Sequence, residues 1–335
     1  MATRDRLAVG LALGGAADAR SWQEALALAG SAEELALDSL WLPEGHLRAG
    51  STSSPLLGLA AFAARTQRIR LGTSSLLISI HPPERVAAEV AALDRLSGGR
   101  VVLGLGRGFD RAIFRAFGVD PRDKRDRFDE ALDAILAIWA GTAASTGPGA
   151  SESGPALEDA RPLQRPHPPL YVAAFGAKGL AQAARRGLPY LASPLESLDA
   201  LARNFALHAE QLPPPCDPAS LPVAVMRTVH VAADRAEAER VRRAAEAEFA
   251  ALAARAAGGP LAARAAGAAA ERVLVGEAGE VAAALARYRD RLGLDLLVVR
   301  AASRVGPAEQ RASLERLVGD VLSRIGVKMP DRPAA

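Results

Sequence analysis

The sequence predicts an α/β protein with a parallel sheet, either closed as a (β/α) barrel or open and doubly wound. Short strand-like runs alternate with amphipathic helices, half of the 335 residues are apolar, and polar or basic residues follow several runs. In proteins of this class the carboxyl ends of the strands form the ligand sites. The predicted strands are Leu7–Leu13, Ser39–Pro43, Ile69–Leu77, Val101–Leu105, Leu170–Ala174, Pro189–Ala192, Val223–Val231 and Asp295–Arg300.

The segments between these strands carry the apolar periodicity of helices that pack on a sheet. In the predicted helix Glu84–Leu96, the side chains of Val86, Val90 and Leu93 fall on one face, and the glycines that follow end the helix. A second helix is predicted over Lys124–Ala140, where an apolar stripe that includes aromatic residues marks a core face.

Two segments break the alternation. Gly141–Pro169 is rich in Gly, Ser, Thr and Pro, and is interpreted as a long connection or an inserted flap. Ala250–Ala270 is rich in alanine and is interpreted as a helical excursion or a mobile lid. We expect a single domain over residues 1–328 and a short tail over residues 329–335.

The composition argues against several classes of protein. Lys and Arg number 41 against 38 Asp and Glu, without a basic tract, and aromatic residues make up only 4%, so no nucleic-acid surface is expected. The single cysteine, Cys216, excludes an internal disulfide framework and a thiolate metal cluster. No apolar stretch approaches the length of a membrane span, and MATRDR leads directly into a strand-like run, so a cytoplasmic protein is expected.

An acid and two histidines follow predicted strands. Glu44 and His46, after the second strand, are either an acid/base pair or a capping carboxylate with a surface histidine. His81, after the third strand, precedes two prolines and either lines the mouth of a pocket or closes the loop. The five histidines show no spaced carboxylate or cysteine partner, so no metal site is predicted, and a serine-hydrolase elbow is absent.

Basic groups and small residues follow two further strands. Arg107, between two glycines after the fourth strand, either captures an anion or is a solvated residue of a turn. Arg122–Arg127 opens a helix with four cations, which oppose the helix dipole unless an anion or the two aspartates offset them. Phe175–Gly179 opens another helix with small residues, whose N–H groups are suited to bind phosphate.

Five blocks of sequence carry a resemblance to a known family. They are LALDSLWLPEGH, RIRLGTSSLLISIHPPERVAAEVAALDRLSGGRVVLGLGRG, FRAFGVDPRDKRDRFDEALDAI, RPHPPLYVAAFGAKGLAQAARRG and VGEAGEVAAALARYRDRLGLDLLVVR. In their order and spacing the chain resembles the bacterial luciferase-like superfamily of flavin- or deazaflavin-dependent barrel oxidoreductases. The resemblance implies a (β/α)8 TIM barrel with insertions at the C-terminal strand ends, where the pocket lies.

The resemblance also implies which residues bind the cofactor. Glu44 would lie beside the isoalloxazine ring, and Ser74 and Ser75 match a strand-end pair that carries a cis peptide bond in many members. Arg107 and Arg125 match phosphate-binding arginines. The other half of the phosphate site would follow the fifth strand, at Ala174, Gly176 and Lys178.

Two departures from the family pattern bear on the chemistry. Luciferases have two adjacent histidines after the glutamate, whereas this chain has Gly45 and His46, so the histidine regarded as the acid/base is missing. This departure argues against light emission and aldehyde oxidation of the luciferase type. Phe175 and Gly176 replace an acid and a serine that help to hold the flavin phosphate, so backbone N–H groups and Lys178 would have to compensate.

The resemblance implies a monooxygenase that uses reduced FMN, supplied by a separate flavin reductase, to oxidise a small organic substrate with O2. His46 and His81 would be its catalytic residues, orienting substrate or relaying protons. A deazaflavin-dependent hydride-transfer enzyme and a non-catalytic flavin-binding protein are the alternatives. Because members of the family commonly dimerise, a homodimer is expected, with neither nucleic acid nor membrane as a partner.

Overall fold

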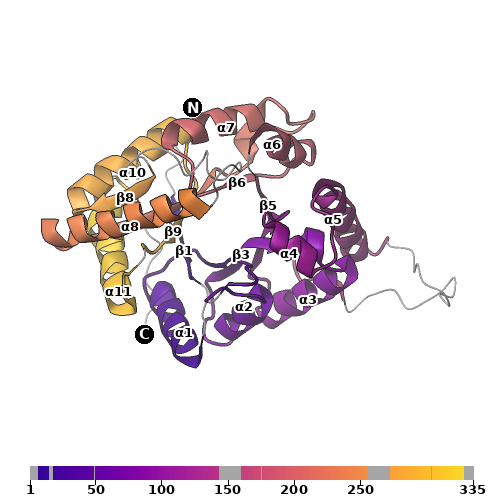
Figure 1. The fold of residues 1–335 in the computed structure, drawn as a ribbon, viewed down its shortest axis with the longest axis horizontal. Helices are drawn as coiled ribbons and strands as arrows, with labels where there is room; N and C mark the ends of the chain where they lie inside the picture. Colours follow the sequence, from indigo (N-terminus) through magenta and orange to yellow (C-terminus); the bar gives the residue numbers. More distant parts are fainter. Residues whose placement is uncertain are drawn as a thin grey trace. The chain divides into compact units, whose positions relative to one another are not determined.

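The fold of the chain is a TIM barrel, a closed barrel of parallel strands with alternating helices (Figure 1). The computed structural model describes residues 7–14, 18–48, 50–142, 160–174, 176–255, 272–302 and 304–327. The strands in this part of the chain are β1 (Ala8–Ala12), β2 (Ser39–Leu42), β3 (Arg70–Leu77), β4 (Val101–Gly106), β5 (Leu170–Ala173), β6 (Tyr190–Ala192), β7 (Ala224–Val231), β8 (Val273–Gly276) and β9 (Leu296–Arg300).

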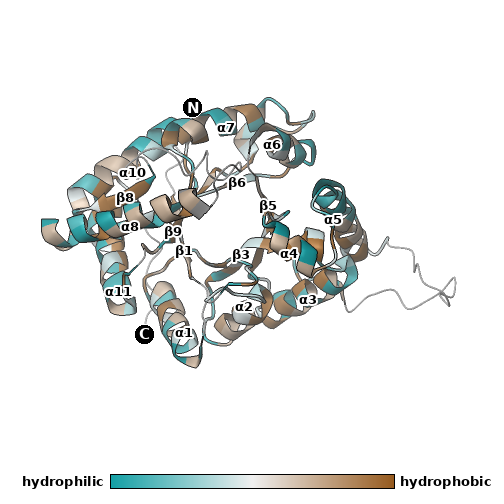
Figure 2. Ribbon diagram, in the orientation of Figure 1, coloured by the Kyte–Doolittle hydropathy of each residue, from teal (hydrophilic) through white to brown (hydrophobic). Residues whose placement is uncertain are grey.

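Helices follow most of the strands, and most of them carry hydrophobic and hydrophilic residues side by side, as amphipathic helices do (Figure 2). Their bounds are α1 (Ala19–Glu34), α2 (Pro55–Ala63), α3 (Pro83–Leu96), α4 (Arg111–Ala116), α5 (Lys124–Ala140), α6 (Gly176–Arg185), α7 (Leu198–Ala209), α8 (Arg235–Arg255), α10 (Ala278–Leu292), α11 (Pro307–Arg316) and α12 (Leu322–Arg324). Short helical turns are η1 (Ile78–Ile80), η3 (Pro218–Ser220) and η5 (Leu317–Val321). None of the described helices combines the length and the apolarity that crossing a membrane requires.

All eight predicted strands are present, and the described residues contain one strand that was not predicted, β8. It pairs in parallel with the second half of β7, from Thr228 to Val231, while the first half of β7 pairs with β9. The sequence of β8 is only VLVG, and a four-residue apolar run cannot be told from the start of a buried helix by periodicity. The extra strand was missed for that reason.

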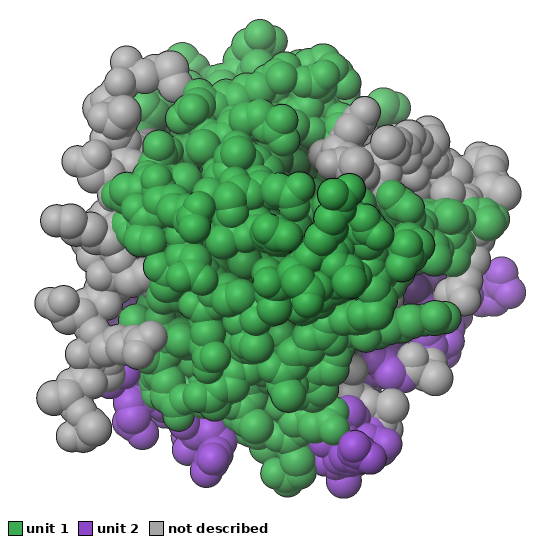
Figure 3. Space-filling model, turned by 90° about the vertical axis from the view of Figure 1, so that its left-hand side faces the viewer, with its two compact units in different colours: residues 1–14, 23–40, 174–335 green, residues 15–22, 41–173 purple. Residues whose placement is uncertain are grey.

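Contacts between residues divide the chain into two compact units, coloured green and purple in Figure 3. Unit 1 comprises residues 1–14, 23–40 and 174–335. Within it β7 is central, because it pairs in parallel with β6, β8 and β9, and β9 also pairs with β1. All eight residues of β7 are buried, including Arg227, whose guanidinium donates to the backbone oxygens of Ser193 and Glu196.

Unit 2 comprises residues 15–22 and 41–173 and contains the parallel strands β3, β4 and β5. Helices α3 and α5 pack on each other, and the indole of Trp139 in α5 donates to the backbone oxygen of Ala87 in α3 at 3.1 Å. Gly72 in β3 leaves room for the buried ring of Trp41, since an added Cβ would come within 2.6 Å of it. The predicted site residues Ser74 and Ser75 lie in β3, and Arg107 directly follows β4.

Both predicted helices are present in the structure. Helix α3 starts at Pro83, one residue before the prediction, and α5 has the predicted bounds. Because α8 continues to Arg255, the first residues of the alanine-rich segment are helical. The rest of that segment, residues 143–159 of the Gly141–Pro169 connection and the tail at 329–335 lie outside the described residues.

Candidate active site

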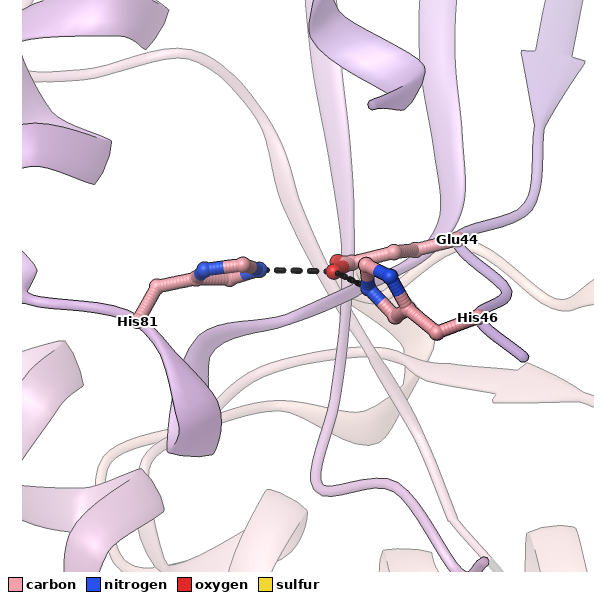
Figure 4. A group of neighbouring side chains, drawn as sticks. All are labelled: Glu44, His46 and His81. Atoms are coloured by element: carbon pink, nitrogen blue, oxygen red, sulfur yellow. Dashed lines mark hydrogen bonds and ion pairs between the residues drawn. The ribbon is translucent and has the colours of Figure 1, made fainter. Parts of the chain in front are cut away.

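Three side chains predicted from separate strand ends meet in unit 2 (Figure 4). Glu44 and His46 follow β2, and His81 follows η1 at the end of β3. One carboxylate oxygen of Glu44, Oε1, lies 2.6 Å from Nε2 of His46 and 2.6 Å from Nε2 of His81. The side chain of Glu44 is 0% exposed, whereas those of His46 and His81 are 11% and 23% exposed. Glu44 is therefore neither a simple helix cap nor a surface group.

The backbone holds the other side of the Glu44 carboxylate. Its Oε2 accepts a hydrogen bond of 2.7 Å from the N–H of Leu77, the last residue of β3. The backbone N–H of Glu44 in turn donates to the carbonyl oxygen of Ser75 at 3.2 Å. Strand β3 thus determines where the carboxylate lies.

The hydrogen bonds around Glu44 favour its ionised form. Burial alone would raise the pKa of this carboxyl, but the hydrogen bond of His81, its charge when it is protonated, the N–H of Leu77 and the hydrogen bond of His46 hold the pKa below its ordinary value. Glu44 is accordingly a carboxylate near neutral pH.

An ionised carboxylate can only accept hydrogen bonds, so Nε2 of both histidines carries the proton that bonds to Glu44. In a neutral imidazole the other nitrogen, Nδ1, is then an acceptor. Within the described part of the chain, neither Nδ1 has a hydrogen-bond partner. In their neutral forms, the two imidazoles therefore offer two nitrogens that can accept a proton.

The distances in the cluster are those of hydrogen bonds and not those of ligands around a metal ion. A zinc ion holds N and O ligands at about 2.0–2.2 Å, which keeps the ligand atoms about 3 Å or more apart. Here each nitrogen lies 2.6 Å from the oxygen, the length of a charge-assisted hydrogen bond. A second group, His230 with Glu237 and Glu309, has its carboxylates paired with Arg316 and Arg240.

Although no spaced carboxylate partner was predicted, three of the five histidines bond a carboxylate in the structure. His81 hydrogen-bonds Glu44, which lies 37 positions away in the sequence, and His230 hydrogen-bonds Glu237 at 2.7 Å. Spacing along the chain could not reveal the first pair, because the partners come from the ends of two different strands.

Ser74 and Ser75 lie in the second half of β3, and the peptide bond between them is cis, as the family resemblance implied. Gly106, at the end of β4, leaves room for the Ser75 side chain, because a Cβ added there would overlap the Ser75 hydroxyl unless that hydroxyl rotated away. The hydroxyl oxygen of Ser74 is buried and has no hydrogen-bond partner among the described residues. Because buried polar groups are normally hydrogen-bonded, this hydroxyl is suited to form a hydrogen bond with a polar group of a ligand.

Arg107 follows β4 and is nearly buried in unit 2. Its guanidinium donates to the carbonyl oxygen of Ala173 at 3.2 Å and lies over the ring of Phe128. Burial, and then the positive charge of Arg125, lower the pKa of Arg107 to about 10, while Asp129 acts in the opposite direction.

Further cations surround Arg107. Burial and the charges of Arg125, Arg107 and Arg111 lower the pKa of Lys124. Because these groups disfavour one another's charged forms, an anion among them would be stabilised. The four cations predicted at the start of α5 differ in their surroundings. Lys124 and Arg125 belong to the group around Arg107. Arg122 instead pairs with Asp120, and Arg127 donates to the carbonyl oxygen of Ser79.

The predicted second half of the phosphate site belongs to unit 1. Ala174 follows β5 and is buried, Gly176 is the first residue of α6 with φ of 68°, and Lys178 is exposed in the first turn of that helix. Phe175 lies outside the described residues. A shared phosphate site of these residues with Arg107 and Arg125 stays a prediction.

Sequence reasoning assigned no role to Leu77 or Phe117. Leu77 contributes only a backbone N–H, which leaves no trace in residue type. The ring of Phe117 contacts both histidines edge to face, at centroid distances of 4.8 Å and 5.7 Å. No spacing rule connects it with either of them.

Charged and polar groups follow β2, β3 and β4 of this TIM barrel. Enzymes with this fold have their active sites at the carboxyl ends of the barrel strands. The model of the luciferase-like monooxygenase family matches residues 6–315, and the chain belongs to this family.

Individual relatives agree with that assignment. The chain is 40% identical over 121 residues to the 4-hydroxyprotoasukamycin monooxygenase of Streptomyces nodosus subsp. asukaensis, covering 36% of this chain and 32% of that protein. It spans about half the length of the first curated relatives it matches, 51% and 44%.

Solved structures share the fold over nearly the whole chain. The monooxygenase RslO1 from Streptomyces bottropensis superimposes with a TM-score of 0.78 at 26% identity, covering 95% of this chain and 100% of that one. The oxygenating constituent of 3,6-diketocamphane monooxygenase from Pseudomonas putida, in complex with FMN, gives a TM-score of 0.75 at 20% identity, covering 97% and 100%.

Proposed function

We propose that the protein is a reduced-FMN-dependent monooxygenase that oxidises a small organic substrate with O2. The observation that carries the proposal is the group of cations around Arg107, in the same unit as the cluster of Glu44, His46 and His81. A phosphate monoester with nearly two negative charges suits such a group. The resemblance to the diketocamphane enzyme, which binds FMN, supports the same cofactor.

The residues present suit both the phosphate group and the isoalloxazine ring of FMN. Arg107 and Arg125, both in unit 2, would hold the phosphate. At the ring end, the residues facing the flavin would be Glu44, Ser74 and Ser75. The unpartnered hydroxyl of Ser74 is an observation in favour of a polar ligand there.

The protein's own groups would bind, orient and move protons, while reduced FMN supplies the two electrons that activate O2. Glu44 holds His46 and His81 with their Nε2 protons inward, so that an Nδ1 can accept a proton from the substrate. A separate flavin reductase would supply the reduced cofactor, and we place the enzyme in the cytoplasm as a homodimer.

The experiment that tests this proposal measures dissociation constants for reduced FMN, riboflavin and a reduced deazaflavin. Reduced FMN is expected to bind most tightly, below about 10 μM. The Arg107→Ala variant should weaken the binding of FMN by tenfold or more and that of riboflavin much less, because only FMN carries the phosphate. Equal losses for both would remove Arg107 from the phosphate site.

The same titrations separate the alternatives. Tight binding of the deazaflavin with weak binding of FMN would overturn the proposal in favour of hydride transfer. If reduced FMN binds but a panel of substrates never raises oxygen consumption above that of free reduced flavin, a non-catalytic flavin-binding protein is supported instead.

A further inference from the structure

The ring of Phe117 lies against the two histidines and is also open to solvent. It meets His46 and His81 edge to face and is 38% exposed. Glu44 is fully buried, whereas His46, His81 and the Phe117 ring are each partly exposed, so the two imidazoles and the ring are the accessible groups of this cluster.

The position of Phe117 is fixed by the short helix that precedes it. The side chain of Asp110 caps α4 by accepting from the N–H of Ala112 at 2.9 Å. Ile113 and Phe114 anchor the helix in an apolar cluster with Leu77 and Ile80. The helix therefore holds Phe117 above the ends of β3 and η1 without burying it.

The polar groups beside this ring, Nδ1 of His46 and of His81, are hydrogen-bond acceptors when the imidazoles are neutral. Both Nε2 protons are committed to Glu44, so each neutral imidazole offers Nδ1 as an acceptor. A molecule bound there can satisfy an Nδ1 only by donating a hydrogen bond, which a hydroxyl group does and an ether does not.

We propose that Phe117 and the histidine pair bind a hydroxylated aromatic substrate of the phenol type. The aromatic ring packs against Phe117, and the phenolic hydroxyl donates to an imidazole Nδ1. Phe117 is then a specificity-determining residue of the oxidation proposed above, on which this assignment of a substrate class rests.

The histidine that accepts the hydrogen bond also acts as a general base. The O–H bond of the phenol breaks, its proton forms an N–H bond at Nδ1, and the electron pair stays on the phenolate oxygen. The resulting imidazolium is neutralised by the ionised Glu44 at its Nε2. The phenolate is a more electron-rich ring than the phenol and is more readily oxygenated.

The test uses 4-nitrophenol, whose phenolate form has its own visible absorption band, and 4-nitroanisole, which has the same ring without the hydroxyl. Both are titrated into the protein alone and into the protein with FMN. We expect 4-nitrophenol to bind about three- to tenfold more tightly than 4-nitroanisole, and its phenolate fraction to rise on binding.

Three variants separate the contributions. Phe117→Leu should weaken both ligands about three- to tenfold, whereas Phe117→Tyr, which keeps the ring, should not. Phe109→Leu is the matched control, because Phe109 is 54% exposed and has no ring contact with the histidines among the described residues. Glu44→Gln should remove the preference for 4-nitrophenol and the phenolate band while 4-nitroanisole still binds.

Equal binding of the two ligands, no binding in either condition, or a Phe117→Leu variant that binds like wild type would each overturn the assignment. The titrations need no reduced flavin and no turnover. The phenol site can therefore fail while flavin binding stands, and flavin binding can fail while the phenol site stands.

Discussion

Glu44 organises the candidate active site, because one of its oxygens accepts hydrogen bonds from two histidines. We expect both His46 and His81 to carry their proton on Nε2 in the wild-type protein, as read from the nitrogen-15 shifts of the imidazole rings. In Glu44→Gln the amide can donate as well as accept, so at least one ring should change tautomer. His230, whose Nε2 bonds Glu237, is the internal control and should keep its shifts. Unchanged shifts at both His46 and His81 would contradict the shared carboxylate.

The same carboxylate makes stability depend on pH in a defined direction. The folded protein holds the pKa of Glu44 below its ordinary value of 4.5, so the unfolded chain binds the proton more readily. The stabilisation from the ionised group is fully present above that value and is lost as the pH falls through the lower folded pKa. The difference in unfolding free energy between wild type and Glu44→Gln should therefore shrink on acidification from neutral pH to about pH 3. A difference that stays constant would show that Glu44 does not ionise more readily in the folded state.

At the scale of the elements, the packing of β2 on β3 limits the size of the side chain that position 72 of β3 can accommodate. In Gly72→Ala the new methyl group would meet the fully buried indole of Trp41, and overpacking of this kind costs about 1–3 kcal/mol. Gly30→Ala in α1 is the matched control, because no atom lies within 4 Å of a Cβ added there. That variant should be neutral or more stable by about 0.5–1 kcal/mol. Denaturant titration of both variants gives the comparison, and a neutral Gly72→Ala would mean that the indole can move aside.

The sequence predicted α5 from a long apolar stripe, and the eight barrel strands from short strand-like runs that alternate with helices. It missed β8, where four apolar residues carry no period. At the site, the position of polar residues after strands identified Glu44, His46, His81 and Arg107 one at a time. That His81 shares the carboxylate of Glu44 follows from the pairing of strand ends in space, which one sequence does not contain.

At the scale of the whole molecule, α2 suggests how a dimer would form. Its sequence, PLLGLAAFA, has no charged residue, and Figure 2 shows few hydrophilic residues on it. One side is buried through Leu56, Leu59 and Phe62, yet Leu57 on another side is 72% exposed. A helix that is apolar all round is usually buried on all sides, so we expect the exposed side to be covered by a second copy of the chain.

Leu57→Glu should therefore weaken the homodimer, because association would bury a charge without a partner. Sedimentation velocity over a concentration series measures the effect, with a dimer expected for wild type and a shift towards monomer for the variant. Leu163→Glu, at another exposed leucine that lies outside the helices, is the control for an added surface charge and should leave the dimer intact. A monomeric wild type would contradict the dimer itself. A Leu57→Glu dimer as strong as wild type would move the interface away from α2 and leave its exposed side to another partner.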